Sequence, residues 1–165
     1  MPPARYLAIV FALFGALGVA AGFHAWTQMG RETPAGFANC AYIARKITLA
    51  SQVDAPKLLI IGGSNAAAGI DALAIAKELR VSAFNFSLFA TFSPGFNLFQ
   101  AKKVLREGDG ALLAFEYLAY EYDKPTNALL DTVYSCGEDY WRSLDWPGRL
   151  LYVFAIRPQR YFSTL

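Results

Sequence analysis

The chain has 165 residues, of which 55% are hydrophobic and 17% are charged, and its formal net charge is +2. This length is sufficient for one domain with a hydrophobic core. The small net charge, with no basic run longer than two residues, argues against a nucleic-acid surface. Two cysteines and one histidine form no pattern that suits a metal ion. We therefore expect no metal, no cofactor and no nucleic-acid partner.

An uncharged apolar segment of 21 residues runs from Tyr6 to Trp26. At about 1.5 Å per residue it spans roughly 31 Å, the thickness of a bilayer core. A cleaved secretory signal is the alternative, but its apolar part is usually only about 7–15 residues long. Arg5 precedes the segment and favours a cytoplasmic N-terminus. We expect residues 1–29 to be an anchor or signal, with a single pass through the inner (cytoplasmic) membrane and the rest on the periplasmic or extracellular side.

The two cysteines are Cys40 and Cys136. An oxidising compartment would permit a disulfide between them, provided that the fold brings their Cα atoms within about 7 Å. Two unpaired cysteines that pack as small apolar residues are the alternative. The sequence leaves both possibilities open.

The elements after the anchor alternate between strands and helices. Residues 30–56 are expected to form a linker and an amphipathic helix (37–53), which ends before Pro56. Residues 57–165 are expected to form an α/β domain, with long crossovers that make its strands parallel and its connections right-handed. The patterns predict strands at 58–61, 81–88 and 111–118 and helices at 65–80 and 97–106, then a short helix within 124–136 and a helix or a strand at 149–156.

In a parallel sheet the carboxyl ends of the strands form one edge, where ligands bind. Three separate stretches meet that edge in the predicted topology: Ser64, Phe89–Gly95 and Glu116–Glu121. The stretch around Ser64, Lys57–Asp71, reads KLLIIGGSNAAAGID.

The Gly-Gly-Ser-Asn turn at residues 62–65 allows three interpretations. It lacks the GxGxxG and GxxxxGK[ST] patterns of nucleotide-binding loops, which argues against phosphate. It suits a simple helix cap, because serine and asparagine accept hydrogen bonds from the first N–H groups of a helix. It also suits a nucleophile, because a serine at a tight strand-to-helix turn is exposed beside N–H groups that stabilise an oxyanion. It is not the GxSxG motif of α/β-hydrolases.

The segment 57–120 resembles the SGNH, or GDSL-like, hydrolase superfamily. LLIIGGSNAAAGIDALAIAKEL looks like its first block, and AFNFSLFATFSPGFNLFQAKKVLREGDGALLAFEYLAY looks like the next part of the domain in membrane-anchored members that act on envelope polymers. That branch resembles proteins of alginate O-acetylation and teichoic acid D-alanylation. The resemblance implies a three-layer parallel sheet of flavodoxin-like/SGNH type behind an N-terminal transmembrane helix.

Carried onto this chain, the resemblance implies that Ser64 is the catalytic nucleophile and that its own N–H is one oxyanion donor. Gly63 and Asn65, on either side of it, are further oxyanion or substrate candidates. The glycine of the second block corresponds to Gly95, which lies late, while Ala90 and Thr91 occupy the nearer positions. Where the family has an asparagine after the third strand, this chain has Glu116 and Tyr117 instead.

The Asp-x-x-His of the family is missing, since the one histidine is His24 in the apolar segment. Either the chain is the N-terminal part of a longer enzyme, or it is non-catalytic. The resemblance therefore implies a membrane-anchored SGNH-like esterase (a hydrolase) or O-acyltransferase of a cell-envelope polysaccharide, inactive as residues 1–165 alone. The alternative is a non-catalytic envelope protein that binds a membrane acyltransferase or another partner.

Overall fold

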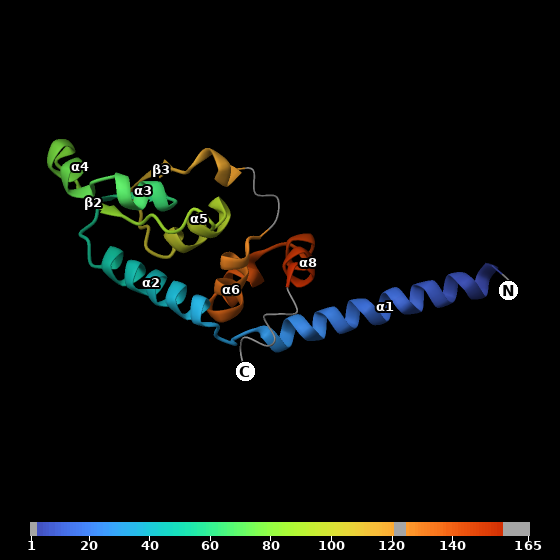
Figure 1. Ribbon diagram of the computed structural model, residues 1–165. Helices are drawn as coiled ribbons and strands as arrows, with labels where there is room; N and C mark the ends of the chain where they lie inside the picture. The colour runs from blue at the N-terminus through green and yellow to red at the C-terminus, as the bar shows by residue number, and fades with distance from the viewer. Residues whose placement is uncertain (1–2, 121–124, 157–165) are drawn as a thin grey trace.

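A computed structural model describes residues 3–120 and 125–156 (Figure 1). It shows a long N-terminal helix followed by an α/β domain with a small parallel sheet. The elements, in chain order, are α1 (Pro3–Gln28), α2 (Pro34–Ser51), β1 (Lys57–Gly62), α3 (Ser64–Gly69), α4 (Ala72–Leu79), β2 (Ser82–Asn85), α5 (Pro94–Lys102), β3 (Gly110–Ala114), the 3-10 helix η1 (Tyr117–Tyr120), α6 (Asn127–Cys136), α7 (Glu138–Ser143) and α8 (Trp146–Ala155).

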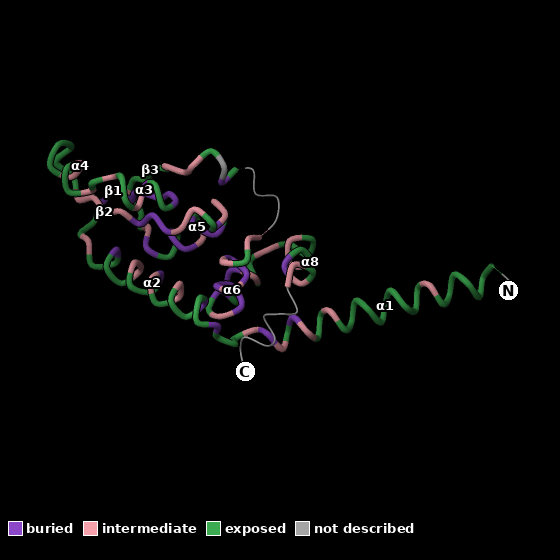
Figure 2. Tube along the Cα trace, viewed as in Figure 1, coloured by how far each residue is buried: buried purple, intermediate pink, exposed green. Residues whose placement is uncertain are grey.

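Helix α1 extends away from the domain, and most of its residues are exposed (Figure 2). Within the described residues it is the one helix that is long and apolar enough to cross a membrane. Water does not favour an exposed surface of this kind, because transfer of apolar surface out of water is favourable. The helix that the apolar segment 6–26 predicts is therefore present, and it carries an apolar surface that the domain leaves uncovered.

The sheet has the order β2-β1-β3, and both pairings are parallel, as the strand-helix-strand order predicts. The central strand β1 is buried, which agrees with its uninterrupted apolar sequence. On the side of β1 that pairs with β2, the hydrogen bonding continues beyond the end of β2. There the backbone N–H groups of Phe86 and Leu88 donate to the carbonyls of Ile60 (2.8 Å) and Gly62 (3.0 Å). The segment after β2 therefore lies beside the carboxyl end of β1.

One hydrophobic cluster joins the sheet to helices α2 and α5. Leu59 and Ile61 project from β1 into it, and Ala50 of α2 and Ala101 of α5 pack against them, all with at most 1% of their surface exposed. Helix α2 therefore shares the core of the α/β domain.

A second cluster joins the end of α1, α2, the 86–93 loop and the C-terminal helices. Its aromatic residues contact one another in a chain, in which Phe92 packs edge-on against Phe96, and Phe96 packs edge-on against Tyr140. Tyr140 in turn contacts Tyr152 of α8. These aromatic contacts hold helices α7 and α8 against the domain.

A disulfide between Cys40 of α2 and Cys136 at the end of α6 closes this cluster, with the two Cα atoms 6.1 Å apart. Of the two alternatives that the sequence leaves open, the structure has the bridged one. Helices α2 and α6 approach closely because Gly36 lacks a side chain. A methyl group there would come within 2.9 Å of the carbonyl oxygen of Asp131.

The prediction of one helix over residues 65–80 is wrong, because two helices occupy this segment. Helix α3 ends at Gly69, and Asp71 begins α4 by accepting hydrogen bonds from the N–H groups of Leu73 (2.8 Å) and Ala74 (3.2 Å). An aspartate in this position is a strong N-cap, and it competes with continuation of the preceding helix.

The predicted third strand, 111–118, is also too long, since β3 ends at Ala114 and a 3-10 turn comes after it. The reason is local: β1 ends at Gly62, which pairs with Ala114, so β3 has no partner strand beyond that point among the described residues. Near the C-terminus, where the sequence allows a helix or a strand at 149–156, the chain forms helix α8.

Candidate functional site

Ser64 is the first residue of α3 and lies just after the carboxyl end of the central strand β1. Its side chain is exposed, whereas Gly63 before it is buried. The turn is tight because Gly62 and Gly63 lack side chains: a methyl group on Gly62 would come within 2.3 Å of the Ala114 carbonyl oxygen. The sequence LLIIGGS therefore places an exposed hydroxyl at the edge of the sheet.

The carboxylate of Glu116 lies against this turn. Its Oε1 accepts a hydrogen bond of 2.8 Å from the backbone N–H of Asn65. A methyl group on Gly63 would overlap the same carboxylate, with 2.0 Å to Oε2. The start of a helix favours a negative charge, which explains why an acidic side chain settles there. Of the candidate residues, Gly63, Asn65 and Glu116 therefore gather around Ser64.

The buried second oxygen of Glu116, Oε2, has no hydrogen-bond partner among the described residues. An unpaired buried carboxylate oxygen is costly, so such an atom commonly belongs to a functional site or faces water. The structure thus brings an acidic group to the Ser64 turn, with one oxygen free within residues 3–120 and 125–156.

Asn85, which the sequence does not single out as a site residue, fastens the other end of α3. Its side-chain amide donates to the carbonyls of Ala66 (2.8 Å) and Ile70 (2.9 Å), and its Oδ1 accepts from the N–H of Ser87 (3.1 Å). These bonds hold the short helix α3 onto β2. Its position at the end of a strand, before a loop, is the signal by which it could have been found.

Behind Asn85, the ammonium group of Lys46 donates to the Asn85 carbonyl oxygen at 2.6 Å and lies over the rings of Tyr42 and Phe84. Burial lowers the pKa of Lys46, because the charged form loses hydration. This cation supports the backbone at the end of β2.

The contacts of Thr91 and Gly95 lead away from α3. The carbonyl oxygen of Thr91 accepts a hydrogen bond of 2.6 Å from the hydroxyl of Thr126, at the start of α6. Gly95 faces α7, since a methyl group on it would lie 3.5 Å from the Tyr140 hydroxyl oxygen. The 86–93 loop thus begins beside β1 and then turns toward the C-terminal helices.

Among the described residues, the Ser64 turn has no histidine that could act as a general base. The one histidine of the chain, His24, lies in α1, and Figure 1 places that helix far from α3. A serine hydroxyl needs a base within hydrogen-bond reach to become a nucleophile. The turn therefore presents a hydroxyl, helix-start N–H groups and a carboxylate, without an imidazole. Within the described ranges, no three histidine, cysteine or acidic side chains gather to hold a metal ion.

A buried ion pair lies at the opposite end of β1. The ammonium of Lys57 contacts Asp109 Oδ2 at 2.7 Å, and neither side chain is exposed to solvent. The hydrogen bond from Lys57 lowers the pKa of Asp109 to about 2, and the N–H groups of Lys57 and Arg106 add to this effect. Asp109 lies in the EGDG turn before β3, and the sequence does not predict its pairing with Lys57.

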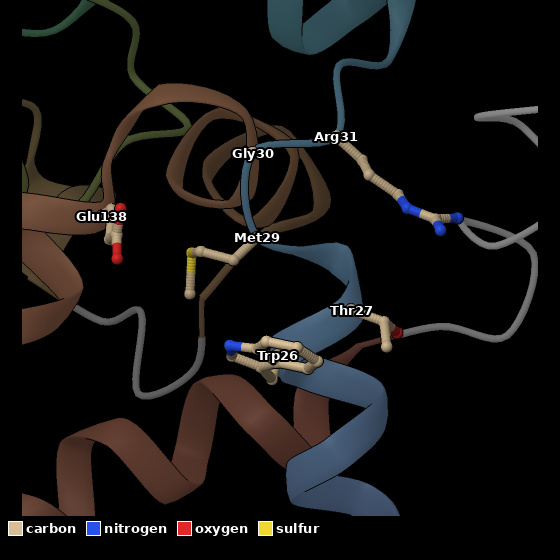
Figure 3. Close-up of a pocket in the computed structure, with 6 residues that line it drawn as sticks. All are labelled: Trp26, Thr27, Met29, Gly30, Arg31 and Glu138. Atoms are coloured by element: carbon tan, nitrogen blue, oxygen red, sulfur yellow. The ribbon is translucent and has the colours of Figure 1, made fainter.

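Two pockets lie where α1 joins the domain, and neither is lined by Ser64. The larger, about 460 Å³, is lined by the end of α1 and the following turn together with Glu138 of α7. In Figure 3 Met29 extends between Trp26 and Glu138, whereas Arg31 points the other way. The pocket is open to solvent, and Trp26 in its lining is 72% exposed. It does not have the enclosed shape of a typical small-molecule site.

The fold and the turn define a class: an α/β domain with an exposed serine at the carboxyl end of the central parallel strand. Searches with the chain find no matching family model, no matching curated protein and no matching solved structure.

Proposed function

We propose that this chain is a membrane-anchored, SGNH-like domain that takes part in acyl-ester chemistry on a cell-envelope polysaccharide, with Ser64 as the nucleophile. The observation that carries the proposal is the exposed Ser64 at the first turn of α3, with the Glu116 carboxylate hydrogen-bonded to the N–H of Asn65. The strand order β2-β1-β3 with long helical crossovers is consistent with the flavodoxin-like/SGNH sheet of three layers.

We place the domain on the periplasmic or extracellular side of the inner membrane, with α1 as a single-pass anchor. The length and exposure of α1 support an anchor. The disulfide between Cys40 and Cys136 supports an oxidising compartment, because such bonds persist outside the cytosol. Both observations agree with the basic residue Arg5 before the apolar segment.

In the proposed reaction the Ser64 oxygen attacks the carbonyl carbon of an acyl donor, and the hydroxyl proton passes to a base. The donor alcohol leaves as the acyl–serine ester forms, and the polysaccharide hydroxyl or water then accepts the acyl group. The N–H of Ser64 would stabilise the oxyanion. His24 lies in α1, far from Ser64, so the proposed base is a group other than this histidine.

The purified chain of 165 residues is expected to hydrolyse a small acetyl ester no faster than its Ser64→Ala variant. General base help is typically worth about 10²–10⁴-fold, and without it only binding and the oxyanion donors act. The measurement is the release of acetate by both proteins at equal concentration. Clear turnover that disappears in Ser64→Ala would contradict the expectation and would mean that Glu116 or another group acts as the base.

A non-catalytic role in which the chain binds a membrane acyltransferase is the second candidate. Strand β3 favours it, because β3 is an edge strand in the described sheet and exposes Leu112 (41%) and Leu113 (53%). An open apolar edge of this kind can accept an extended segment of a partner.

The two candidate functions predict different ester contents of the polysaccharide when the chain is substituted in the cells that produce it. If Ser64 is the nucleophile, a strain that carries only Ser64→Ala is expected to lose the ester-linked acyl groups of its envelope polysaccharide, while Leu112→Lys retains them. If the chain only binds a partner, Ser64→Ala retains the esters and Leu112→Lys loses them, because a charged side chain disfavours strand addition at an edge. The measurement is the amount of acid released from purified polysaccharide by mild alkali.

A further inference from the structure

Helix α8 (Trp146–Ala155) is apolar on the side that faces solvent. Its exposed residues include Trp146 (73%), Leu150 (41%) and Phe154 (67%), which recur every four positions and so lie along one face. Leu151 (37%) widens this face. We call these four residues the outer face of α8. It carries no charged residue, in contrast to the solvent side of an ordinary surface helix.

The opposite side of α8 packs into the domain. Tyr152 is buried in the same cluster as Ala25 of α1, and its ring contacts Tyr140. Helix α8 is therefore apolar on its buried side and on its outer face, a pattern that occurs in helices covered by protein or by lipid. The exposure of large aromatic side chains on a continuous face marks an interaction surface.

The position of α8 indicates what covers the outer face. Val153 of α8 and Trp141 of α7 line a pocket of about 290 Å³ together with Gly22, Ala25 and Trp26 of α1. Its lining is mostly apolar, and the ion-paired Glu138 and Arg142 of α7 complete it. In Figure 1, α8 is the part of the domain that lies farthest along α1 toward its N-terminus. Helix α8 is thus located beside the last two turns of the segment that is apolar enough to cross a membrane.

Helix geometry gives an estimate of how far below the membrane–water interface the α1 residues beside α8 lie. If Trp26 marks the membrane–water interface, where tryptophan is enriched, Gly22 lies about 6 Å deeper at about 1.5 Å per residue. Amphipathic helices that lie in the interface bury their apolar faces by about 5–10 Å. Phe23 and Trp26, near the end of α1, are themselves exposed apolar residues, at 64% and 72%.

We propose that the outer face of α8 is inserted into the headgroup region of the bilayer that α1 crosses, so that the domain is held on the lipid surface at a second point. This inference rests on the anchor in the proposed function, but not on the chemistry of Ser64. Because the outer face is uncharged, its insertion does not need anionic lipid. The consequence is that the domain lies close to the membrane in a defined orientation instead of swinging on a single helix.

The test uses the full chain in phosphatidylcholine vesicles that contain lipid brominated near the headgroup end of the acyl chains. The chain has three tryptophans, so Trp26→Phe with Trp141→Phe leaves Trp146 as the single fluorophore. The matched control carries all three Trp→Phe changes together with Leu73→Trp, at an 80% exposed position of α4. Flotation of the vesicles reports membrane association through α1 separately from the fluorescence.

We expect Trp146 emission to fall at least about twofold in brominated vesicles, because bromine quenches at contact and an interfacial face reaches about 5–10 Å into the lipid. The Leu73→Trp control should keep its emission. A second single-tryptophan variant, with Phe154→Trp and Trp146→Phe added to the same background, should be quenched like Trp146. This variant keeps the test valid if one substitution disturbs folding, which far-ultraviolet circular dichroism checks.

Three outcomes would overturn the inference. A chain that floats with the vesicles, but whose Trp146 is quenched no more than the control, has α1 in the membrane and α8 outside the lipid. Shielding of Trp146 from both bromine and aqueous iodide would place a protein partner or a second copy on the outer face. A chain that does not float, or a mature N-terminus that begins after Ala25, removes the anchor itself and overturns the inference along with the proposed location.

Discussion

Replacement of Cys40 and Cys136 by serine is expected to lower the free energy of unfolding by about 4–5 kcal/mol. The bridge joins residues 96 positions apart, and a cross-link over about 100 residues removes about 4.7 kcal/mol of loop-closure entropy from the unfolded chain. Most single domains are stable by only about 5–15 kcal/mol. Loss of the disulfide should therefore bring the domain close to the limit of folding.

The measurement is urea unfolding in mild detergent, followed by near-ultraviolet circular dichroism of the tyrosines around Tyr140. Cys40→Ser, Cys136→Ser and the double variant should be equally destabilised, because each removes the same cross-link. Treatment of the wild-type chain with dithiothreitol should reproduce the effect. A loss below about 1 kcal/mol in all three variants would contradict the expectation and would mean that the packing of α2 on α6 suffices without the bridge.

Asp109→Asn is expected to destabilise the domain by about 3–5 kcal/mol. The substitution leaves the ammonium of Lys57 buried without a counter-charge, and breaking a buried pair from one side has a cost of this order. Asp139→Asn is the matched control, because Asp139 pairs with Lys103 at the surface and surface pairs contribute about 0–1 kcal/mol.

The double variant Lys57→Met with Asp109→Asn is expected to recover a large part of this stability, since it removes the uncompensated charge and keeps a side chain of similar volume. Equal stability of Asp109→Asn and Asp139→Asn in urea titrations would be the contrary result. It would mean that water reaches Lys57 when its partner is removed.

The Lys57–Asp109 ion pair also makes the stability of the domain depend on pH in acid. The pKa of Asp109 is lowered from 3.8 to about 2 in the folded chain, chiefly by its hydrogen bond with Lys57. A lowered pKa contributes stability that is complete above the unfolded value and is lost as the pH falls through the folded value. The wild-type domain should therefore lose stability between about pH 4 and pH 2 more steeply than the Lys57→Met, Asp109→Asn variant.

Several features could be predicted from the sequence because they depend on local patterns. The uncharged segment Tyr6–Trp26 predicts helix α1, because length and hydropathy alone decide whether a helix can span a bilayer. The run LLIIGG predicts a buried strand and a tight turn, and Ser64 lies where that pattern places it, after the central strand. The parallel pairing results from crossovers that are long enough for helices.

Boundaries that depend on neighbouring elements are predicted less well. Gly69, which ends α3, and Asp71, which caps α4, are residue types that commonly mark helix ends. The apolar residues through 65–80 nevertheless keep helical spacing, so the pattern predicts one continuous helix. Strand β3 is shorter than its apolar run because a strand needs a partner, and β1 ends at Gly62. The sequence of β3 contains no mark of where its neighbour stops.

Only the tertiary structure shows which distant residue joins the Ser64 turn and where α8 packs. Glu116 is 51 residues from Asn65, and only the pairing of β3 with β1 brings its carboxylate to the N–H of Asn65. The disulfide between Cys40 and Cys136 likewise depends on how closely α2 approaches α6 at Gly36. The residues of α8 predict an apolar segment, but its position beside α1 results from the burial of Tyr152 in a cluster that includes Ala25. The hydrophobic effect is non-directional, so the sequence does not indicate which distant residues will cover Tyr152.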